Sequence, residues 1–299
     1  MRSTFRALVA AALIAIPASW PADPSIRAAE PPAPTLPEED PEFQRLLAEL
    51  ARRADEYRQE ALGFRCRESV IEAKYNIETS SHKNSKNLTF DYLFVRRDGI
   101  LREYRQMLVK TRNDEWKRRK ADFEPPLPPA YLWSSLFSST NKGRFHFRPA
   151  GQVVRAYRLL HLIDFTGISP NPGGTDISGW SGQVAVDARS HNLWSITAQP
   201  TGQEVRLEVE ILKYNRAFAI AGVPLASRPH GWLLEIVFGF EREGLSYPTQ
   251  QTLSMTSLAR SQDMRVEEKT TFRYERYEFF ETEITAEEYF GEVPLDPTN

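Results

Sequence analysis

Cysteine is almost missing from this sequence, since Cys66 is the only one in 299 residues. A single cysteine excludes a disulfide within the chain and any zinc or iron–sulfur site built on several cysteines. The five histidines are scattered, and none lies two or four residues from another, so no local metal-binding pattern exists. Glycine-rich phosphate loops and dinucleotide fingerprints are missing as well. The sequence therefore predicts neither a metal nor a cofactor.

The sequence also lacks an excess of charge and a long apolar run. Its 38 Lys+Arg against 40 Asp+Glu leave a net charge of −2, which gives no reason to expect a nucleic-acid partner. The apolar run at residues 7–16 is too short to span a bilayer, which takes about 20 residues. Because it follows Arg2 and Arg6, it has the layout of a secretory signal peptide. We predict a signal peptide at 1–29 and a periplasmic or secreted protein, bacterial because it lacks disulfides.

Proline is concentrated near the N-terminus, where residues 21–41 hold seven of the 21. Such a segment forms no core, and we predict a Pro-rich tether at 30–40 that packs on nothing. Asp40 and Pro41 then form a helix start signal. Apolar residues recur at helical spacing after it, and Gly63 can end the helix. The apolar positions of this predicted helix are Phe43, Leu46, Leu47, Leu50, Ala54, Tyr57 and Ala61.

After Gly63 the apolar pattern changes from a helical period to an alternation typical of strands. The predicted strands are 64–78, 89–98, 100–110, 144–149, 153–166, 180–187, 192–199, 203–217, 231–241, 245–258 and 264–284. In one of them, Val205, Leu207, Val209 and Ile211 alternate with charged residues. In another, Trp232, Leu234, Ile236, Phe238 and Phe240 form an apolar stripe that should face the helices. A short helix is expected at 130–137 and a helical turn at 286–290.

These elements predict a mainly β fold of the α+β class. We expect a large antiparallel curved sheet, or unclosed β-barrel, of about 11 strands, with a long N-terminal helix and a short helix on its concave side. No linker-like gap divides residues 41–290, so they should form a single domain, followed by a C-terminal tail at 291–299.

No catalytic motif is present. Gly179-Trp-Ser-Gly182 lacks the last glycine of a serine-hydrolase elbow and runs into a predicted strand. Cys66, between two arginines that should point to the opposite side of its strand, is predicted to be a buried structural thiol. If the chain were an enzyme, His161 with Asp164 or His191 with Asp187 would be the first candidates. We expect no enzymatic activity.

Three segments together resemble the LolA-type periplasmic lipoprotein carriers. They are the N-terminal helix leading into Leu62-Gly-Phe-Arg-Cys-Arg-Glu68, the pair Gly179-Trp-Ser-Gly-Gln-Val-Ala-Val-Asp187 and His191-Asn-Leu-Trp-Ser-Ile196, and Thr271-Phe-Arg-Tyr-Glu-Arg-Tyr-Glu-Phe-Phe280. The resemblance implies an unclosed barrel with an apolar cavity between sheet and helices. Relatives carry lipoprotein acyl chains, bind lipids or sense envelope stress. The tether and a basic insertion at 110–129 depart from the compact carriers.

The leading functional hypothesis is a non-catalytic cell-envelope protein that holds an apolar ligand, an acyl chain or lipid, in the barrel cavity. The predicted lining residues are Phe90, Tyr92, Phe94, Trp194, Leu234, Ile236, Phe238 and Phe240. The alternative is a protein-interaction or envelope-sensor module with a filled core, and a hydrolase without a recognisable motif comes third.

A basic hairpin is the remaining candidate surface. Residues 96–120 contain ten Lys+Arg against four acids. We expect either ordinary solvated surface or, with Trp116 at the tip, a peripheral contact with an anionic membrane surface. The residues of that contact would be Arg112, Lys117, Arg118, Arg119 and Lys120.

Overall fold

The computed structural model describes residues 40–60, 63–97, 100–111, 115–119, 123, 125, 127–169, 176–221 and 228–280. All of them belong to one compact unit, Pro37–Asn299. The predicted signal peptide, the tether up to residue 39, the helical turn at 286–290 and the tail at 291–299 lie outside the described residues.

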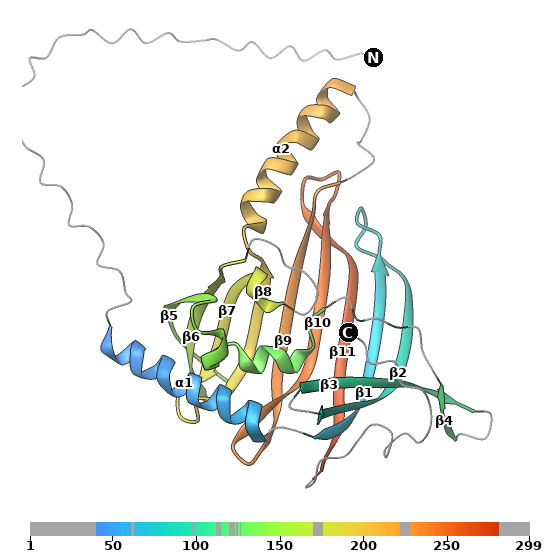
Figure 1. The fold of residues 1–299 in the computed structure, drawn as a ribbon. Coiled ribbons are helices and arrows are strands. Elements are labelled where there is room, and N and C mark those ends of the chain that lie inside the picture. Colours follow the sequence, from blue (N-terminus) through green and yellow to red (C-terminus); the bar gives the residue numbers. More distant parts are fainter. Residues whose placement is uncertain are drawn as a thin grey trace, which may run out of the picture. The chain divides into compact units, whose positions relative to one another are not determined.

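Eleven strands form one antiparallel sheet in the order β4-β3-β2-β1-β11-β10-β9-β8-β7-β6-β5, and its ends do not meet (Figure 1). The predicted open, curved antiparallel sheet is therefore confirmed. The strands are β1 Phe64–Tyr75, β2 His82–Arg97, β3 Ile100–Lys110, β4 Trp116–Arg119, β5 Phe145–Arg155, β6 Arg158–Gly167, β7 Trp180–Asp187, β8 Leu193–Pro200, β9 His230–Arg242, β10 Leu245–Leu258 and β11 Met264–Phe279. The helices are α1 Pro41–Glu60 and α2 Gln203–Ala221, with 3₁₀ helices η2 Ala130–Ser135, η3 Ser139–Asn141 and η4 Ile177–Gly179.

Helix α1 begins where the sequence predicts it. The Asp40 carboxylate accepts a hydrogen bond of 2.9 Å from the backbone N–H of Glu42, which is how an N-cap satisfies a free helix donor. Phe43, Leu50, Ala54 and Tyr57 are buried and belong to the same core as the sheet. Helix α1 and η2 therefore cover the concave face of the sheet.

The stripe on β9 also faces the way its alternation predicts. Leu234, Ile236 and Phe238 are buried in that core, and Trp232 and Phe240 pack against it. The intervening Leu233, Glu235, Val237, Gly239 and Glu241 are exposed. Cys66 is buried as predicted, and burial raises the pKa of its thiol, so it stays protonated at neutral pH.

The prediction of a strand at 203–217 is wrong, because this segment is helix α2. Glu, Leu, Arg, Lys and Ala, which favour helices, make up most of it. The apolar residues that alternate along the sequence also recur at helical spacing, so the pattern fits both periods. The Gln203 side chain takes the place of a strand beside β9: its Nε2 donates to Trp232 O at 2.9 Å and its Oε1 accepts from Trp232 N at 2.6 Å.

Smaller differences concern the edges of the sheet. Strand β4, Trp-Lys-Arg-Arg, was not among the predicted strands, because all four residues are exposed and show no alternation. The turn between β5 and β6 falls at Ala156 and Tyr157, both with positive φ, and not near residue 151. The short helix predicted at 130–137 is the 3₁₀ helix η2.

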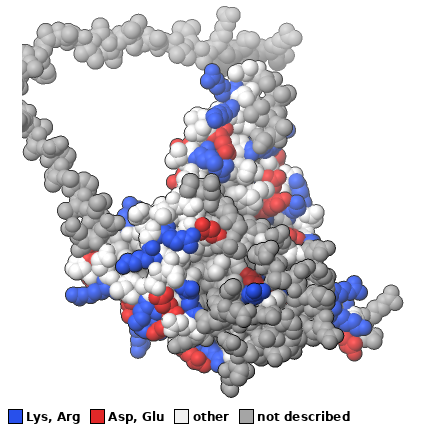
Figure 2. Space-filling model, in the orientation of Figure 1, with Lys and Arg blue, Asp and Glu red and all other residues white. Residues whose placement is uncertain are grey.

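The surface carries both signs of charge. Lys and Arg side chains alternate with Asp and Glu over the face shown in Figure 2. Among the described residues, no helix combines the length and the apolar character needed to cross a membrane.

Candidate functional site

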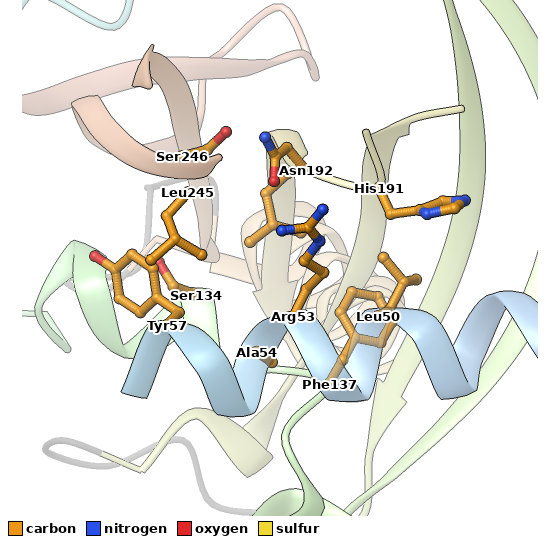
Figure 3. Close-up of a pocket in the computed structure, with 11 residues that line it drawn as sticks. Leu50, Arg53, Ala54, Tyr57, Ser134, Phe137, His191, Asn192, Leu245 and Ser246 are labelled. Carbon is orange, nitrogen blue, oxygen red and sulfur yellow. The ribbon is translucent and has the colours of Figure 1, made fainter. Parts of the chain in front are cut away.

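Two depressions lie along α1, and His191 lines both of them. The smaller one, shown in Figure 3, lies between the second half of α1, the η2 region, the turn after β7 and the start of β10. Its volume of about 30 Å³ suits one or two waters. An acyl chain does not fit there.

Polar groups line part of this small cavity. The Tyr57 hydroxyl and the Ser134 hydroxyl are buried at its wall, and burial raises the pKa of Tyr57. The buried Nε of Arg53 has no hydrogen-bond partner. This polar lining is suited to hold water or a small polar group.

The larger depression, here called the α1 groove, has a volume of about 740 Å³, within the range of about 300–1,000 Å³ typical of small-molecule sites. It runs between the first half of α1 and strands β5 and β6. Apolar Phe43, Leu46 and Ile163 contribute to its lining, and Phe43 and Ile163 also belong to the core. Its polar lining residues are Asp40, Glu42, Arg45, Glu49, Gln152, His161 and His191. An apolar floor with a charged rim can hold an amphipathic molecule.

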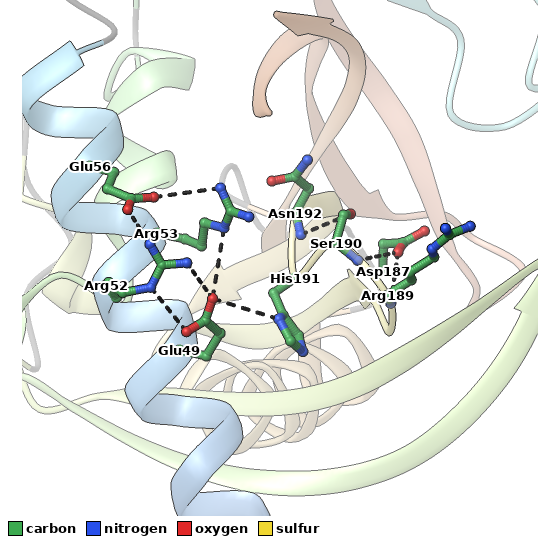
Figure 4. Close-up of polar contacts among 9 residues, drawn as sticks. All are labelled: Glu49, Arg52, Arg53, Glu56, Asp187, Arg189, Ser190, His191 and Asn192. Atoms are coloured by element: carbon green, nitrogen blue, oxygen red, sulfur yellow. Dashed lines mark hydrogen bonds and ion pairs between the residues drawn. The ribbon is translucent and has the colours of Figure 1, made fainter. Parts of the chain in front are cut away.

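A charged network on α1 borders the groove (Figure 4). Arg52 donates hydrogen bonds to Glu49 at 2.5 and 3.0 Å and also pairs with Glu56. The hydrogen bond from Arg52 holds the pKa of Glu49 below its ordinary value. The Glu49 carboxylate oxygen also lies 3.9 Å from Nδ1 of His191, so this contact joins α1 to the turn after β7.

The turn between β7 and β8 sets the position of His191. The Asp187 carboxylate accepts hydrogen bonds from the backbone N–H groups of Arg189 at 2.9 Å and Ser190 at 2.8 Å. Partial burial by itself raises the pKa of Asp187, but these backbone donors outweigh it and keep the pKa below its ordinary value. His191 follows with a positive φ of 58°. The turn therefore presents the imidazole to both depressions.

Neither predicted catalytic pair is formed through side chains. His191 donates its backbone N–H to the backbone oxygen of Asp187, while the Asp187 carboxylate binds the turn. The His161 ring contacts Gln152 at 3.3 Å, and Asp164 accepts from Gln183 at 3.0 Å and Arg148 at 3.1 Å. No group of three His, Cys, Asp or Glu arranged to hold a metal occurs among the described residues.

The predicted lining residues mostly lie together, in the packed core and not along the α1 groove. Phe90, Tyr92, Phe94, Leu234, Ile236 and Phe238 are buried there, and Phe240 packs against them. Their rings contact neighbours closely, as Phe94 and Tyr131 do at 3.8 Å between ring centres. Trp194 does not join this set, because the register shift between β7 and β8 falls on it and leaves it without a paired residue on β7. The Arg158 guanidinium lies 5.4 Å from its ring centre.

A buried ionic cluster was not identified from the sequence. Arg105 Nε lies 2.7 Å from one oxygen of Glu68, and another guanidinium nitrogen lies 2.5 Å from Glu103. Glu68 is fully buried, and the Arg105 guanidinium also covers the Tyr92 ring at 4.7 Å. One feature of the sequence could have indicated that Glu68 is buried, since alternation places it on the same strand face as Phe64 and Cys66.

The basic hairpin formed by β3 and β4 is partly neutralised by its own neighbours. Lys117, Arg118 and Arg119 are exposed, while Arg112 and Lys120 lie outside the described residues. Arg118 pairs with Asp91 at 2.7 Å, and the Arg67 guanidinium lies 5.4 Å from the centre of the Trp116 ring. Its contact with an anionic surface stays a prediction.

Known proteins resemble this chain in fold. No family model and no curated protein matches it. Similar solved structures include a putative outer membrane lipoprotein-sorting protein domain from Vibrio parahaemolyticus, with 10% identity, a TM-score of 0.41 and coverage of 82% of this chain and 96% of that one. A LolA superfamily protein from Nitrosomonas europaea has 10% identity, a TM-score of 0.36 and coverage of 79% and 94%. A DUF1329 family protein from Desulfovibrio piger has 9% identity, a TM-score of 0.41 and coverage of 83% and 97%. All three have TM-scores below 0.5 and identities of 9–10%, so they carry no argument about the function of this chain.

Proposed function

We propose that this chain is an exported, non-catalytic envelope protein that binds an amphipathic ligand, an acyl chain with a polar end, in the α1 groove. The observation that carries the proposal is the groove itself, about 740 Å³ in volume with Phe43, Leu46 and Ile163 in its lining. Burial of an acyl chain gains about 0.8 kcal/mol per CH₂. The polar end of the ligand would meet Arg45, His161 and His191 at the rim.

The groove is a better place for the ligand than the face predicted from the sequence. Phe90, Tyr92, Phe94, Leu234, Ile236 and Phe238 are buried against one another and against α1. A ligand among them would first have to separate packed rings, and protein interiors resist such opening because their packing is dense.

Export is part of the proposal and is supported by the N-terminal sequence. Arg2 and Arg6 precede the apolar run at 7–16, as in secretory signal peptides. A periplasmic location would bring the groove close to lipids and lipid-modified proteins.

Uptake of a fluorescent fatty acid tests the proposal, with native mass spectrometry of the purified protein to detect lipid that co-purifies. Leu46 is half-buried and lines the groove, so Leu46→Glu places a charge against the acyl chain, which is strongly unfavourable. We expect uptake to fall by about tenfold or more, which corresponds to about 1.4 kcal/mol. Ala48→Glu is the matched control, because Ala48 is exposed on the same helix.

Two results would reject the proposal. Equal uptake by the wild type and Leu46→Glu would show that the fatty acid binds elsewhere. No lipid in native spectra and no uptake by the wild type would favour the alternative, a protein-interaction or sensor module with a filled core.

A further inference from the structure

Helix α2 extends away from the sheet (Figure 1), and its first part is attached to β9 by side-chain hydrogen bonds. Gln203 binds both backbone groups of Trp232, and Arg206 donates to His230 O at 3.1 Å. Leu207 closes the attachment, with a side-chain carbon 3.0 Å from where a Cβ on Gly231 would lie. Beyond this first part Tyr214 is still buried, but other large apolar side chains of the helix are exposed to water.

Helix α2 carries five of the thirteen large hydrophobic side chains that are exposed among the described residues. Leu212 is 70% exposed, Phe218 45% and Ile220 80%. Such side chains, grouped on one protruding element, mark an interaction site more often than a solvated surface. A single helix of this length is also marginally stable in water without a packing partner.

Charge and apolar character follow an order along the helix axis. The acids Glu204, Glu208 and Glu210 all lie in the half near the sheet. Lys213 and Arg216 follow, and no acid occurs in α2 beyond Glu210. The last residues, from Ala217 to Ala221, are apolar. In Figure 2, Lys and Arg side chains appear on the outer part of the protruding helix at the top of the view.

This order matches the layers of a membrane surface. We propose that the outer half of α2 inserts into the interfacial region of an anionic lipid bilayer. With a rise of 1.5 Å per residue, Arg216 and Lys213 lie about 6 and 10 Å behind Ile220 along the axis. Interfacial helices bury their apolar groups about 5–10 Å deep, so Phe218 and Ile220 reach the acyl boundary while the two cations meet lipid phosphates.

A second copy of the chain fits this surface less well. Val205, Val209, Leu212 and Ile220 recur at helical spacing along the exposed side, and Arg216 lies in the middle of this stripe. Packing two copies through the stripe would bury the guanidinium against apolar side chains, which is costly for an unpaired charge. Against a bilayer, the long Arg216 side chain can reach a phosphate while its stem stays in apolar surroundings.

Co-sedimentation with vesicles tests the inference. The probes are vesicles of phosphatidylcholine alone and of equal parts phosphatidylcholine and phosphatidylglycerol. We expect the full mature chain to bind the anionic vesicles. The double variant Phe218→Glu, Ile220→Glu should bind them about tenfold less. Added salt should weaken binding of the wild type, because it screens the attraction between the two cations and the lipid phosphates. Val205→Glu is the matched control, since Val205 is 67% exposed on the same helix but near the sheet, and its binding should change less than about twofold.

Other outcomes would overturn the inference. Vesicle binding that the double variant retains, or that Val205→Glu loses equally, would exclude insertion of the outer half. Binding lost in Lys117→Glu, Arg119→Glu with α2 intact would assign the contact to the basic hairpin. A concentration-dependent dimer in light scattering that Ile220→Glu dissociates would show that a second copy covers the helix. The inference is independent of the α1 groove, because Leu46→Glu should leave vesicle binding unchanged.

Discussion

Arg105 is surrounded by two carboxylates in the interior of the sheet. The side chains of Glu68 and Arg105 are no more than 9% exposed, and Glu103 completes the cluster at 2.5 Å. Burial raises the pKa of Glu103 above its ordinary value, although the charge of Arg105 opposes this effect. One guanidinium therefore serves two buried carboxyl groups, and its removal leaves both of them without a cation.

Arg105→Leu should lower the free energy of unfolding by about 3–5 kcal/mol at neutral pH, the usual cost of breaking a buried ion pair on one side. The variant raises the pKa of Glu103 further. When the pKa of a carboxyl is higher in the folded protein than in the unfolded chain, the free energy of unfolding falls as the pH rises from the unfolded-state pKa to the folded-state pKa. The deficit should therefore shrink as pH falls from 8 to about 5.

Urea unfolding of both proteins at several pH values measures this deficit. Arg273→Leu is a suitable control, since Arg273 is exposed on β11, and it should cost little at any pH. A deficit for Arg105→Leu that does not depend on pH would contradict the proposed role of Glu103.

A substitution of Phe238 on β9 tests whether the residues around it form a packed core or line a ligand cavity. It is 5% exposed and lies in the core with α1. Because the surrounding side chains already fill the space, Phe238→Ala should cost about 3–5 kcal/mol through lost transfer energy and a new cavity. Uptake of fatty acid in the α1 groove should persist in the folded fraction. Thermal or urea unfolding gives the first quantity, and the fluorescent assay gives the second.

Val237→Ala provides the comparison for this experiment. Val237 is adjacent, faces the opposite side and is 40% exposed, so its truncation should cost much less. A small cost for Phe238→Ala together with lost uptake would restore the cavity lining predicted from the sequence.

At the scale of elements, local signals were enough where they agreed with each other. The capping pair Asp40 and Pro41 placed the start of α1, and alternation bounded by turn residues placed β7 and β10 at the residues observed. Helix α2 shows where such signals fail. Val205 and Val209 fit a strand face and a helix face alike, and neither residue packs in the core to decide between them.

The attachment of α2 provides a test of this interpretation. Gln203→Ala removes both side-chain hydrogen bonds to the Trp232 backbone, at a point where β9 has no paired residue on β8. We expect a loss of about 1–3 kcal/mol, because both backbone groups lose their partner. Hydrogen exchange at the amide of residue 232 should become faster, as measured by mass spectrometry or NMR.

Asn215→Ala is the control, since Asn215 lies farther along the same helix. It should change neither stability nor exchange at β9 appreciably. Unchanged exchange at residue 232 in Gln203→Ala would mean that the glutamine does not substitute for a neighbouring strand.

At the scale of the whole molecule, the sheet could be predicted from the sequence and the site could not. Repeated alternation indicated many antiparallel strands without needing their order. The α1 groove depends on residues brought together from α1, β5, β6 and the turn after β7. His191 and Glu49 approach to 3.9 Å, but nothing in either local sequence refers to the other, so only the folded chain reveals their contact.

The pairing of the first strand with the last also determines how the protein responds to force. Phe64 at the start of β1 lies beside Phe279 at the end of β11. A pull on these two ends loads the hydrogen bonds between the strands one after another, as in a zipper, and not all at once. The pairing of β1 with β11 divides the sheet into the four strands β4-β3-β2-β1 and the seven from β11 to β5. A pull applied at residues 64 and 279 would therefore open the sheet between β1 and β11 at low force, whereas a pull on the N-terminal side must first detach α1 from the core.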